Sequence, residues 1–315
     1  MYNMTKEGFP KVYIIILNWN GSEDTIKCVN SFLWLQYPNY EILVVDNGST
    51  DGSVHRIKEN FSDVTLIETG RNLGYTGGNN VGIEYAMNNK AGYVLIINND
   101  TELVNPYFVR EIIKKMEENH KIGIMGPKVL NSGSQVQDTV LFTPRLFSCI
   151  KESLGLRFRT KRAKDYNILQ QVEAVSGVCW LIRTDVVKKV GLLDEDYFMY
   201  AEEQDYCYRA KEAGWEIMYF PIESVFHKKG SEDEDKERVY RQYIYARRNL
   251  VLFLRKHFGF WQALVLAGLF LTSNGFKVLL SRLTGRERGF YNVSLLSVLC
   301  SKIKWALNRQ RMQKL

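Results

Sequence analysis

The chain has 315 residues, of which 45% are hydrophobic and 24% charged, a composition typical of a globular protein with room for two domains. Its 6 prolines and 23 glycines exclude a collagen-like chain, and its 5 cysteines, with no Cys-x-x-Cys pair, argue against a disulfide framework or a structural zinc site. The net charge of +7 joins an acidic body, with 27 basic and 34 acidic residues at 1–237, to a basic extension, with 15 basic residues and one acid at 238–315.

Strands alternate with helices through the first 119 residues. Apolar runs predict strands at 12–17, 41–45, 64–68 and 93–97, and helical periodicity predicts helices at 25–35, 54–60, 81–88 and 107–119. Because the strands are apolar throughout, they are expected to be buried on both faces. We therefore predict an α/β fold whose mostly parallel sheet is flanked by helices.

The rest of the chain continues this pattern and then changes character. After a less regular segment, strands are predicted at 175–183, 215–220 and 225–227, and helices at 185–189 and within 194–214. Beyond residue 237 the chain becomes basic, aromatic and apolar. We predict one domain over residues 1–237 and a helical, membrane-associating extension over residues 238–315.

Polar side chains follow the predicted strands at the points where these end. Asn18, Asp46, Arg71 and Asp100 all lie at or just past a strand end. Ligands of open α/β sheets bind beyond the carboxyl ends of the strands, so these residues should gather at one edge. The Asp46 carboxylate is suited to accept hydrogen bonds from a nucleobase or a ribose, although it can instead cap the next helix.

Asp100 ends the segment Asn98-Asn99-Asp100, which directly follows an apolar strand. A carboxylate there can bind Mg²⁺ or Mn²⁺, which in turn holds a diphosphate; a turn with an Asx cap is the alternative. His227 ends another predicted strand and would complete the metal site if the two strand ends face each other. A lone histidine is, however, more often structural.

Three acids fall within four positions at residues 202–205, in an aromatic setting. Packing like charges together raises the pKa of at least one of them, which is how a general base is tuned. The spacing of Asp205 and Arg209 predicts a structural ion pair, which leaves Glu202 and Glu203 to face the cleft. The alternative is an exposed acidic helix start that the helix dipole favours.

Seven segments in order over about residues 10–230 resemble those of the family 2 glycosyltransferases, which are inverting enzymes with the GT-A fold. They read VYIIILNWNG, EILVVDNGSTDGS, RNLGYTGGNN, YVLIINNDTEL, VSGVCWLIR, GLLDEDYFMYAEEQDYCYR and VFHKKG. The rhamnosyltransferase-like branch is the most similar. The resemblance implies a catalytic domain over residues 1–237 that moves a sugar from dTDP-rhamnose or a UDP-sugar to a saccharide or lipid-linked saccharide in cell-surface glycan synthesis.

The resemblance also implies roles for individual residues. It places the nucleotide base at Asp46 with Asn18 and Arg71, the ribose or donor sugar near Gly77, Gly78 and Asn79, the Mg²⁺ or Mn²⁺ at Asp100 and His227, and the catalytic base at Glu203 with Glu202 as second choice. The implied reaction is one in-line displacement, in which the deprotonated acceptor hydroxyl attacks the anomeric carbon.

Two residues depart from the family pattern. Asn98, a donor-site residue, replaces the usual first aspartate of the metal motif. This replacement keeps open a second function, a non-catalytic scaffold that binds nucleotide sugars in a polysaccharide assembly complex. Glu203 stands where aspartate is usual, and its additional methylene lengthens its reach by more than about 1 Å.

The extension contains 19 uncharged residues at 258–276, with Lys and Arg on both sides. We expect its helices to lie on the cytoplasmic face of the cell membrane, with basic side chains on anionic head groups. A single membrane span is the second choice, because Gln262 and Asn274 interrupt the apolar run. A soluble helix pair that forms a homodimer is the third, and nucleic-acid binding by the basic residues is the least expected.

Overall fold

The computed structural model describes residues 8–131, 133–153, 165–228, 236–283 and 293–309. The chain divides into two compact units, residues 1–142 with 161–229 and residues 143–160 with 230–315. The second unit thus includes residues 143–160, which the predicted boundary at residue 237 assigns to the first domain.

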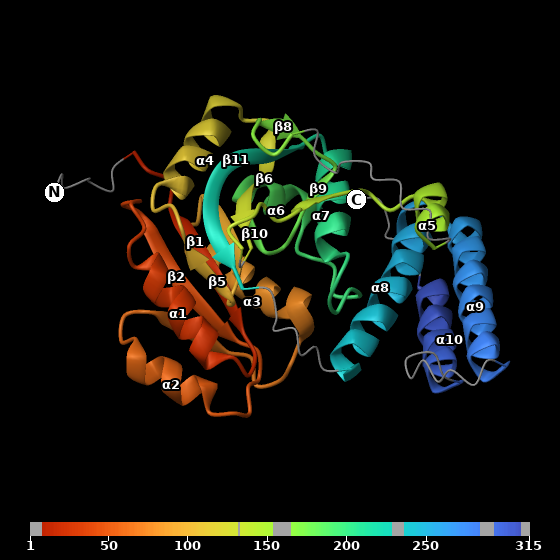
Figure 1. The fold of residues 1–315 in the computed structure, drawn as a ribbon. Helices are drawn as coiled ribbons and strands as arrows, with labels where there is room; N and C mark the ends of the chain where they lie inside the picture. The colour runs from red at the N-terminus through yellow and green to blue at the C-terminus, as the bar shows by residue number, and fades with distance from the viewer. Residues whose placement is uncertain (1–7, 132, 154–164, 229–235, 284–292, 310–315) are drawn as a thin grey trace. The chain divides into compact units, whose positions relative to one another are not determined.

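The first unit is built on a nine-stranded sheet in the order β3-β2-β1-β4-β10-β6-β11-β5, with β8 paired to β11 (Figure 1). Its strands are β1 (Val12–Asn18), β2 (Tyr40–Asp46), β3 (Thr65–Glu68), β4 (Tyr93–Asn98), β5 (Thr101–Leu103), β6 (Ile122–Leu130), β8 (Gln170–Gln171), β10 (Cys179–Arg183) and β11 (Glu216–His227). A small second sheet pairs β7 (Val140–Leu141) with β9 (Ala174–Val175).

The pairing aligns the carboxyl ends of the first strands. β1 runs parallel to β2 and to β4, with Asn18 opposite Asp46 and Leu17 opposite Asn98. β10 runs antiparallel between β4 and β6, so the sheet is mixed beyond β4. The predicted α/β fold is confirmed, and the register places the ends of β1, β2 and β4 at one edge.

Helices cover both faces of this sheet (Figure 1). They are α1 (Ser22–Phe32), α2 (Ser53–Asn60), α3 (Gly74–Asn88), α4 (Phe108–Glu118), α6 (Thr184–Val190) and α7 (Glu202–Glu212). On β1, Ile14 packs into the core that contains α1 and α4, whereas Ile15 packs into the core that contains α3 and α7. This alternation explains why the strand is apolar at every position.

Several elements differ from the sequence prediction, among them β11, which is one strand where two were predicted, and α3 and β6. α3 begins at Gly74 rather than at residue 81, so most of the expected glycine-rich loop is helical. β6 has no counterpart among the predicted strands, although it lies inside the sheet between β10 and β11.

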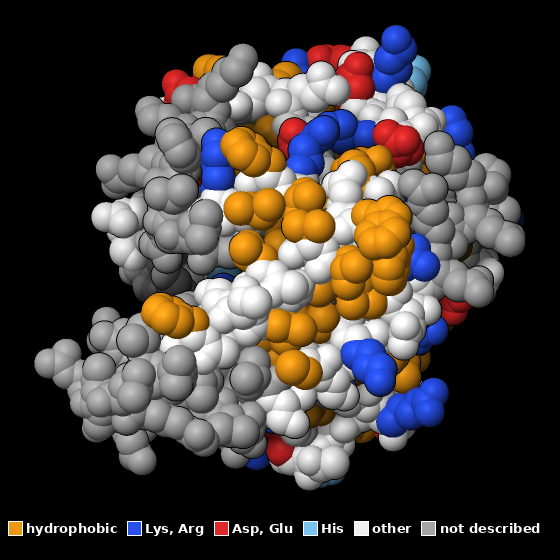
Figure 2. All heavy atoms as spheres, turned by 90° about the vertical axis from the view of Figure 1, so that its right-hand side faces the viewer, with side chains coloured by type: hydrophobic (Ala, Val, Ile, Leu, Met, Phe, Trp, Pro, Cys, Tyr) orange, Lys and Arg blue, Asp and Glu red, His pale blue; other side chains and the backbone are white. Residues whose placement is uncertain are grey.

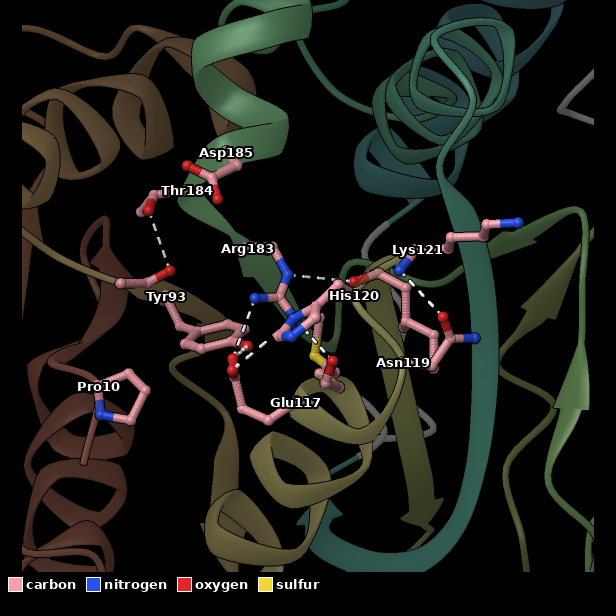
Figure 3. Close-up of polar contacts among 12 residues, drawn as sticks. Pro10, Tyr93, Glu117, Asn119, His120, Lys121, Arg183, Thr184 and Asp185 are labelled. Carbon is pink, nitrogen blue, oxygen red and sulfur yellow. Dashed lines mark hydrogen bonds and ion pairs between the residues drawn. The ribbon is translucent and has the colours of Figure 1, made fainter. Parts of the chain in front are cut away.

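At the amino edge of the sheet, Arg183 is nearly buried at the end of β10. Its guanidinium donates to Glu117 Oε1 at 3.0 Å and to the carbonyl oxygens of Met116 at 2.6 Å and Ile122 at 3.4 Å. Tyr93 donates its hydroxyl to the same glutamate, and the guanidinium lies over the Tyr93 ring (Figure 3). The buried charge is therefore paired and its donors are used, which links α4 to the sheet.

The second unit is helical. It contains α5 (Leu146–Ser153), α8 (Lys236–His257), α9 (Phe260–Leu283) and α10 (Val293–Asn308), and α8, α9 and α10 contact one another. Residues 143–160 group with this unit because α5 packs against α9. No helix in the described part of the chain, α9 included, is long and apolar enough to cross a membrane.

Candidate functional site

Asn18 and Asp46 lie side by side at the ends of β1 and β2. Asn18 Nδ2 donates to Asp46 Oδ2 at 2.7 Å, and the Ser49 amide donates to Asp46 Oδ1 at 2.9 Å. Asp46 is only 2% exposed, so its carboxylate stabilises the loop after β2 from inside the fold. Its contact with a nucleotide base stays a prediction.

The backbone of Arg71 packs closely against Gly48 at the same edge of the sheet. Gly48 has a φ of +75°, and a Cβ there would lie 2.5 Å from Arg71 Cα, so only glycine fits this turn. The Arg71 side chain is exposed beside the end of β2, where a cation can attract an anionic ligand.

Gly77, Gly78 and Asn79 are buried in the first turns of α3. A Cβ on Gly78 would lie 2.4 Å from Leu17 Cδ1, so the absence of a side chain lets α3 pack closely on β1. Asn79 donates from Nδ2 to the Tyr75 carbonyl oxygen at 2.8 Å, while its buried Oδ1 has no partner. Packing explains the two glycines, and contact of these residues with a donor sugar stays a prediction.

The structure brings Asp100 and His227 together. β11 pairs antiparallel with β5, and His227 Nε2 lies 3.3 Å from Asp100 Oδ1. His227 Nδ1 lies 2.9 Å from Gln137 Oε1. If Nδ1 carries the proton and donates it to Gln137, the lone pair of Nε2 faces a carboxylate oxygen, an arrangement that a cation between them would stabilise.

The donor set of Asp100 and His227 fits a divalent cation. One carboxylate oxygen and one imidazole nitrogen are suitable ligands for Mn²⁺, and Gln137 holds the ring in place. Among the described residues, no three His, Cys, Asp or Glu form a metal cluster. A cation here would thus need further ligands from elsewhere, such as phosphate oxygens.

Glu202 and Glu203 begin α7 after a strained backbone segment. Tyr200 and Ala201, with φ values of 71° and 69°, are consecutive non-glycine residues in the left-handed region. Glu203 is half-buried and accepts a hydrogen bond at Oε1 from the Gly177 amide at 3.2 Å. Glu202 is 4% exposed, and its Oε2 has no hydrogen-bond partner.

Burial makes both glutamates weaker acids. Burial, together with the charge of Glu203, raises the pKa of Glu202 well above its ordinary value. Burial also raises the pKa of Glu203, and the Gly177 amide opposes that rise by donating to the carboxylate. A carboxylate with a raised pKa is a stronger base, as proton abstraction near neutral pH requires.

Asp205 and Arg209 support this helix start. Arg209 Nε donates to Asp205 Oδ2 at 2.7 Å, as the i,i+4 spacing predicts. The same guanidinium donates to the carbonyl oxygens of Val190 and Leu192 at 3.1 and 3.0 Å. The pair fixes the orientation of α7 and leaves the two glutamates for other roles.

Hydrogen bonds connect Glu203 and Asp46 to the end of β4. The backbone amide of Asn98 donates to the carbonyl oxygen of Val178, the residue after Gly177, at 3.0 Å. On the other side, Asn99 Nδ2 donates to Thr25 Oγ1 at 3.0 Å, and that hydroxyl donates to Asn18 Oδ1 at 2.7 Å. One edge of the sheet therefore carries most of the predicted site residues.

Sequence reasoning missed four of the residues that build this edge. Thr25, Tyr75, Gln137 and Gly177 each contact a predicted site residue or the backbone that holds one. Only Gly177 had a signal in the sequence, a glycine between Ser176 and Val178 near the start of a predicted strand, which is typical of a close backbone approach.

Comparison with known proteins assigns this architecture. The family model described as "Glycosyl transferase family 2" matches residues 13–191. The chain is 30% identical to the "Low-salt glycan biosynthesis hexosyltransferase Agl10" of Haloferax volcanii, over 73% of this chain and 71% of that protein. It is 27% identical to the "N-acetylglucosaminyl-diphospho-decaprenol L-rhamnosyltransferase" of Mycobacterium tuberculosis, over 70% of this chain and 77% of that protein.

Solved structures share the fold. A mannosyltransferase from Pyrobaculum calidifontis, in complex with GDP-Man and Mn²⁺, matches 95% of this chain and 88% of its own, with a TM-score of 0.56 and 14% identity. GalNAc-T7 with UDP, GalNAc and Mn²⁺ matches 79% of this chain and 48% of its own, with a TM-score of 0.60 and 14% identity. At these identities the likeness is one of fold.

Proposed function

The chain belongs to glycosyltransferase family 2, and from this premise we propose that it transfers a sugar, with inversion, from a nucleoside-diphosphate sugar to a saccharide or lipid-linked saccharide. The observation that carries the proposal is the placement of Glu203. Its carboxylate is held by the Gly177 amide, next to the strand end that bears Asn98 and Asp100, and its pKa is raised by burial.

Glu203 acts as the general base in this proposal. Its carboxylate accepts the proton of the acceptor hydroxyl while the oxygen attacks the anomeric carbon, and the bond to the nucleoside diphosphate breaks on the opposite face. Glu202 is a less suitable base, because it is more deeply buried than Glu203 and no hydrogen bond holds its Oε2 in place. One base and one displacement invert the configuration at the anomeric carbon.

Asp100 and His227 would hold Mg²⁺ or Mn²⁺, which when bound neutralises the charge of the leaving diphosphate. Gln137 orients the imidazole, and the exposed Arg71 adds a positive charge on the same edge. Asn98 supplies a neutral amide where the family usually has a second carboxylate. The cation therefore has one charged ligand fewer, and we expect a modest metal affinity.

A donor screen tests this function. We expect dTDP-rhamnose, UDP-GlcNAc, UDP-galactose or GDP-mannose, with Mn²⁺, to raise the melting temperature of the protein, and the stabilising donor to be turned over with a prenyl-diphosphate-linked GlcNAc. The names of two relatives, a hexosyltransferase and a rhamnosyltransferase, guide this choice. Stabilisation without turnover on any acceptor would favour the scaffold function, and no stabilisation by any donor would contradict both.

We also propose that the second unit docks on the inner face of the cell membrane. The apolar stripe of α9, formed by Trp261, Leu264, Val265 and Phe276, is exposed, with Trp261 at 75%. Residues 143–151, 239–276 and 297–309 contain ten Lys or Arg and no Asp or Glu. Figure 2 shows a band of hydrophobic side chains with Lys and Arg beside it, a combination suited to anionic lipid.

Vesicle binding tests the docking proposal. We expect the full chain to sediment with vesicles that contain about 30% phosphatidylglycerol and much less with pure phosphatidylcholine, and Trp261→Ser to reduce binding about tenfold. The matched control is Trp34→Ser, which removes an exposed tryptophan of the first unit. Equal binding of the two variants would contradict a role for the stripe, while salt-sensitive RNA binding or a concentration-dependent dimer would favour the other partners.

A further inference from the structure

Two residues far from Glu203 in the sequence hold its carboxylate in place. The Gly177 amide donates to Glu203 Oε1 at 3.2 Å, and the Tyr75 hydroxyl donates to the Gly177 carbonyl oxygen at 2.8 Å. The Tyr75 amide donates in turn to the Phe198 carbonyl oxygen at 2.8 Å, in the loop before α7. Tyr75 therefore braces the peptide beside Glu203 and the segment that leads to it.

The space beside Glu203 exists because residue 177 has no side chain. A Cβ there would lie 2.6 Å from the Tyr75 hydroxyl oxygen and 3.3 Å from Glu203 Cγ. The next residue, Val178, is fixed to β4 because its carbonyl oxygen accepts a hydrogen bond from the backbone amide of Asn98. The backbone at Gly177 therefore has little freedom to move away. The Glu203 side chain occupies room that any other residue at 177 would reduce.

We propose that Tyr75 and Gly177 are positioning residues for the base, and that the length of Glu203 is matched to its hydrogen bond with the Gly177 amide. Shortening the side chain by one methylene would withdraw the carboxylate by about 1.5 Å from the amide that now orients it. The proposal rests on the proposed function, since it takes Glu203 to be the base.

Steady-state kinetics of the full chain test the match, with the donor that the wild-type protein turns over. We expect Gly177→Ala to lower kcat about 100-fold with little change in the KM of the donor, because a shift of about 1 Å costs roughly that much. Tyr75→Phe should lower kcat about tenfold. In a Glu203→Asp background, Gly177→Ala should cost less than about threefold, because the shorter side chain has already lost the hydrogen bond from the Gly177 amide.

Gly275→Ala is the control, since a Cβ there meets nothing within 4 Å. If Gly177→Ala costs the same factor in the wild-type background as in the Glu203→Asp background, or raises the KM of the donor instead, the proposed match is wrong. If Gly177→Ala does not fold, Tyr75→Phe tests the positioning role in its place.

A second readout is independent of turnover. The carboxyl ¹³C resonance of Glu203, assigned by its loss in Glu203→Gln, reports the titration of this group. Because the Gly177 amide favours the charged carboxylate, displacing it in Gly177→Ala should move the titration to higher pH. An unchanged titration would contradict the positioning role, whereas failure of every donor in the screen would contradict the proposed function alone.

Discussion

At the amino edge of the sheet a buried arginine meets a carboxylate and two carbonyl oxygens, whereas at the carboxyl edge two adjacent glutamates meet each other. Arg183 uses its donors on Glu117, Met116 and Ile122. Glu202 leaves one buried oxygen without a partner, and the backbone just before it is strained. The same sheet thus buries a charged group with hydrogen-bond partners at one edge, and a carboxyl oxygen that lacks a partner at the other.

The pKa values follow this contrast. At the amino edge, burial alone would raise the pKa of Glu117, but the Tyr93 hydroxyl and the Arg183 guanidinium outweigh it and hold the pKa below its ordinary value. At the carboxyl edge, burial raises the pKa of both glutamates. Compensated charge stabilises a fold, while uncompensated charge is retained where chemistry needs it.

The largest expected effect is at the carboxyl edge. Glu203→Gln should lower kcat by about 10²–10⁴, since the amide cannot accept the proton of the acceptor hydroxyl. The melting temperature should not fall, because the substitution removes a repulsive charge next to Glu202. Glu212→Gln, at the exposed end of the same helix, is the matched control. Retained turnover in Glu203→Gln would move the base to Glu202.

The amino edge should respond in stability instead. Arg183→Met should lower the free energy of unfolding by about 3 kcal/mol, because the carbonyl oxygens of Met116 and Ile122 lose their donor and Glu117 loses its cation. Urea unfolding measures the loss, with the exposed Lys188→Met as control. The kcat of the folded protein should stay within about twofold. A loss confined to kcat would mean that the two edges do not differ as described.

The sequence predicted some strands of the sheet and missed others. β1, β2 and β4 were predicted because their residues are apolar without interruption, and their ends then placed Asp46 and Asp100 at one edge. β6 was missed because Gly126 and Pro127 interrupt its apolar run, although both are accommodated inside the sheet.

The first turns of α3 were missed for a different reason. Their glycines have low helix propensity, but close packing on Leu17 favours the helix, and such tertiary contacts are invisible in a local pattern. The same limit applies to the site. The roles of Gly177 and Tyr75 depend on the backbone amide and carbonyl oxygen of residue 177, and every residue type except proline has both groups.

A smaller effect should appear in the pH dependence of stability. Because the folded pKa of Glu202 is raised, the folded state keeps a proton that the unfolded state loses above about pH 4.3, so stability falls as the pH rises from there. Glu202→Gln should remove this fall and be about 1 kcal/mol more stable than wild type at about pH 8, with little difference at about pH 4.

Glu117→Gln should show the opposite pH dependence of stability. The folded pKa of Glu117 is lowered, so its contribution is present above its unfolded pKa and is lost as the pH falls through the folded value. The variant should therefore be less stable than wild type at about pH 7 and approach it at low pH. Parallel pH profiles for the two variants would contradict the contrast between the edges.

The smallest effects should come from exposed ion pairs, which both edges have. Lys11 lies 2.8 Å from Glu41 at the starts of β1 and β2, and Lys228 lies 3.0 Å from Asp24 near the end of β11. Lys11→Ala and Lys228→Ala should each change the free energy of unfolding by less than about 0.5 kcal/mol, and less still in about 0.5 M salt, because water and ions screen such pairs. If either variant lost as much stability as Arg183→Met, surface charge rather than buried charge would account for the difference between the edges.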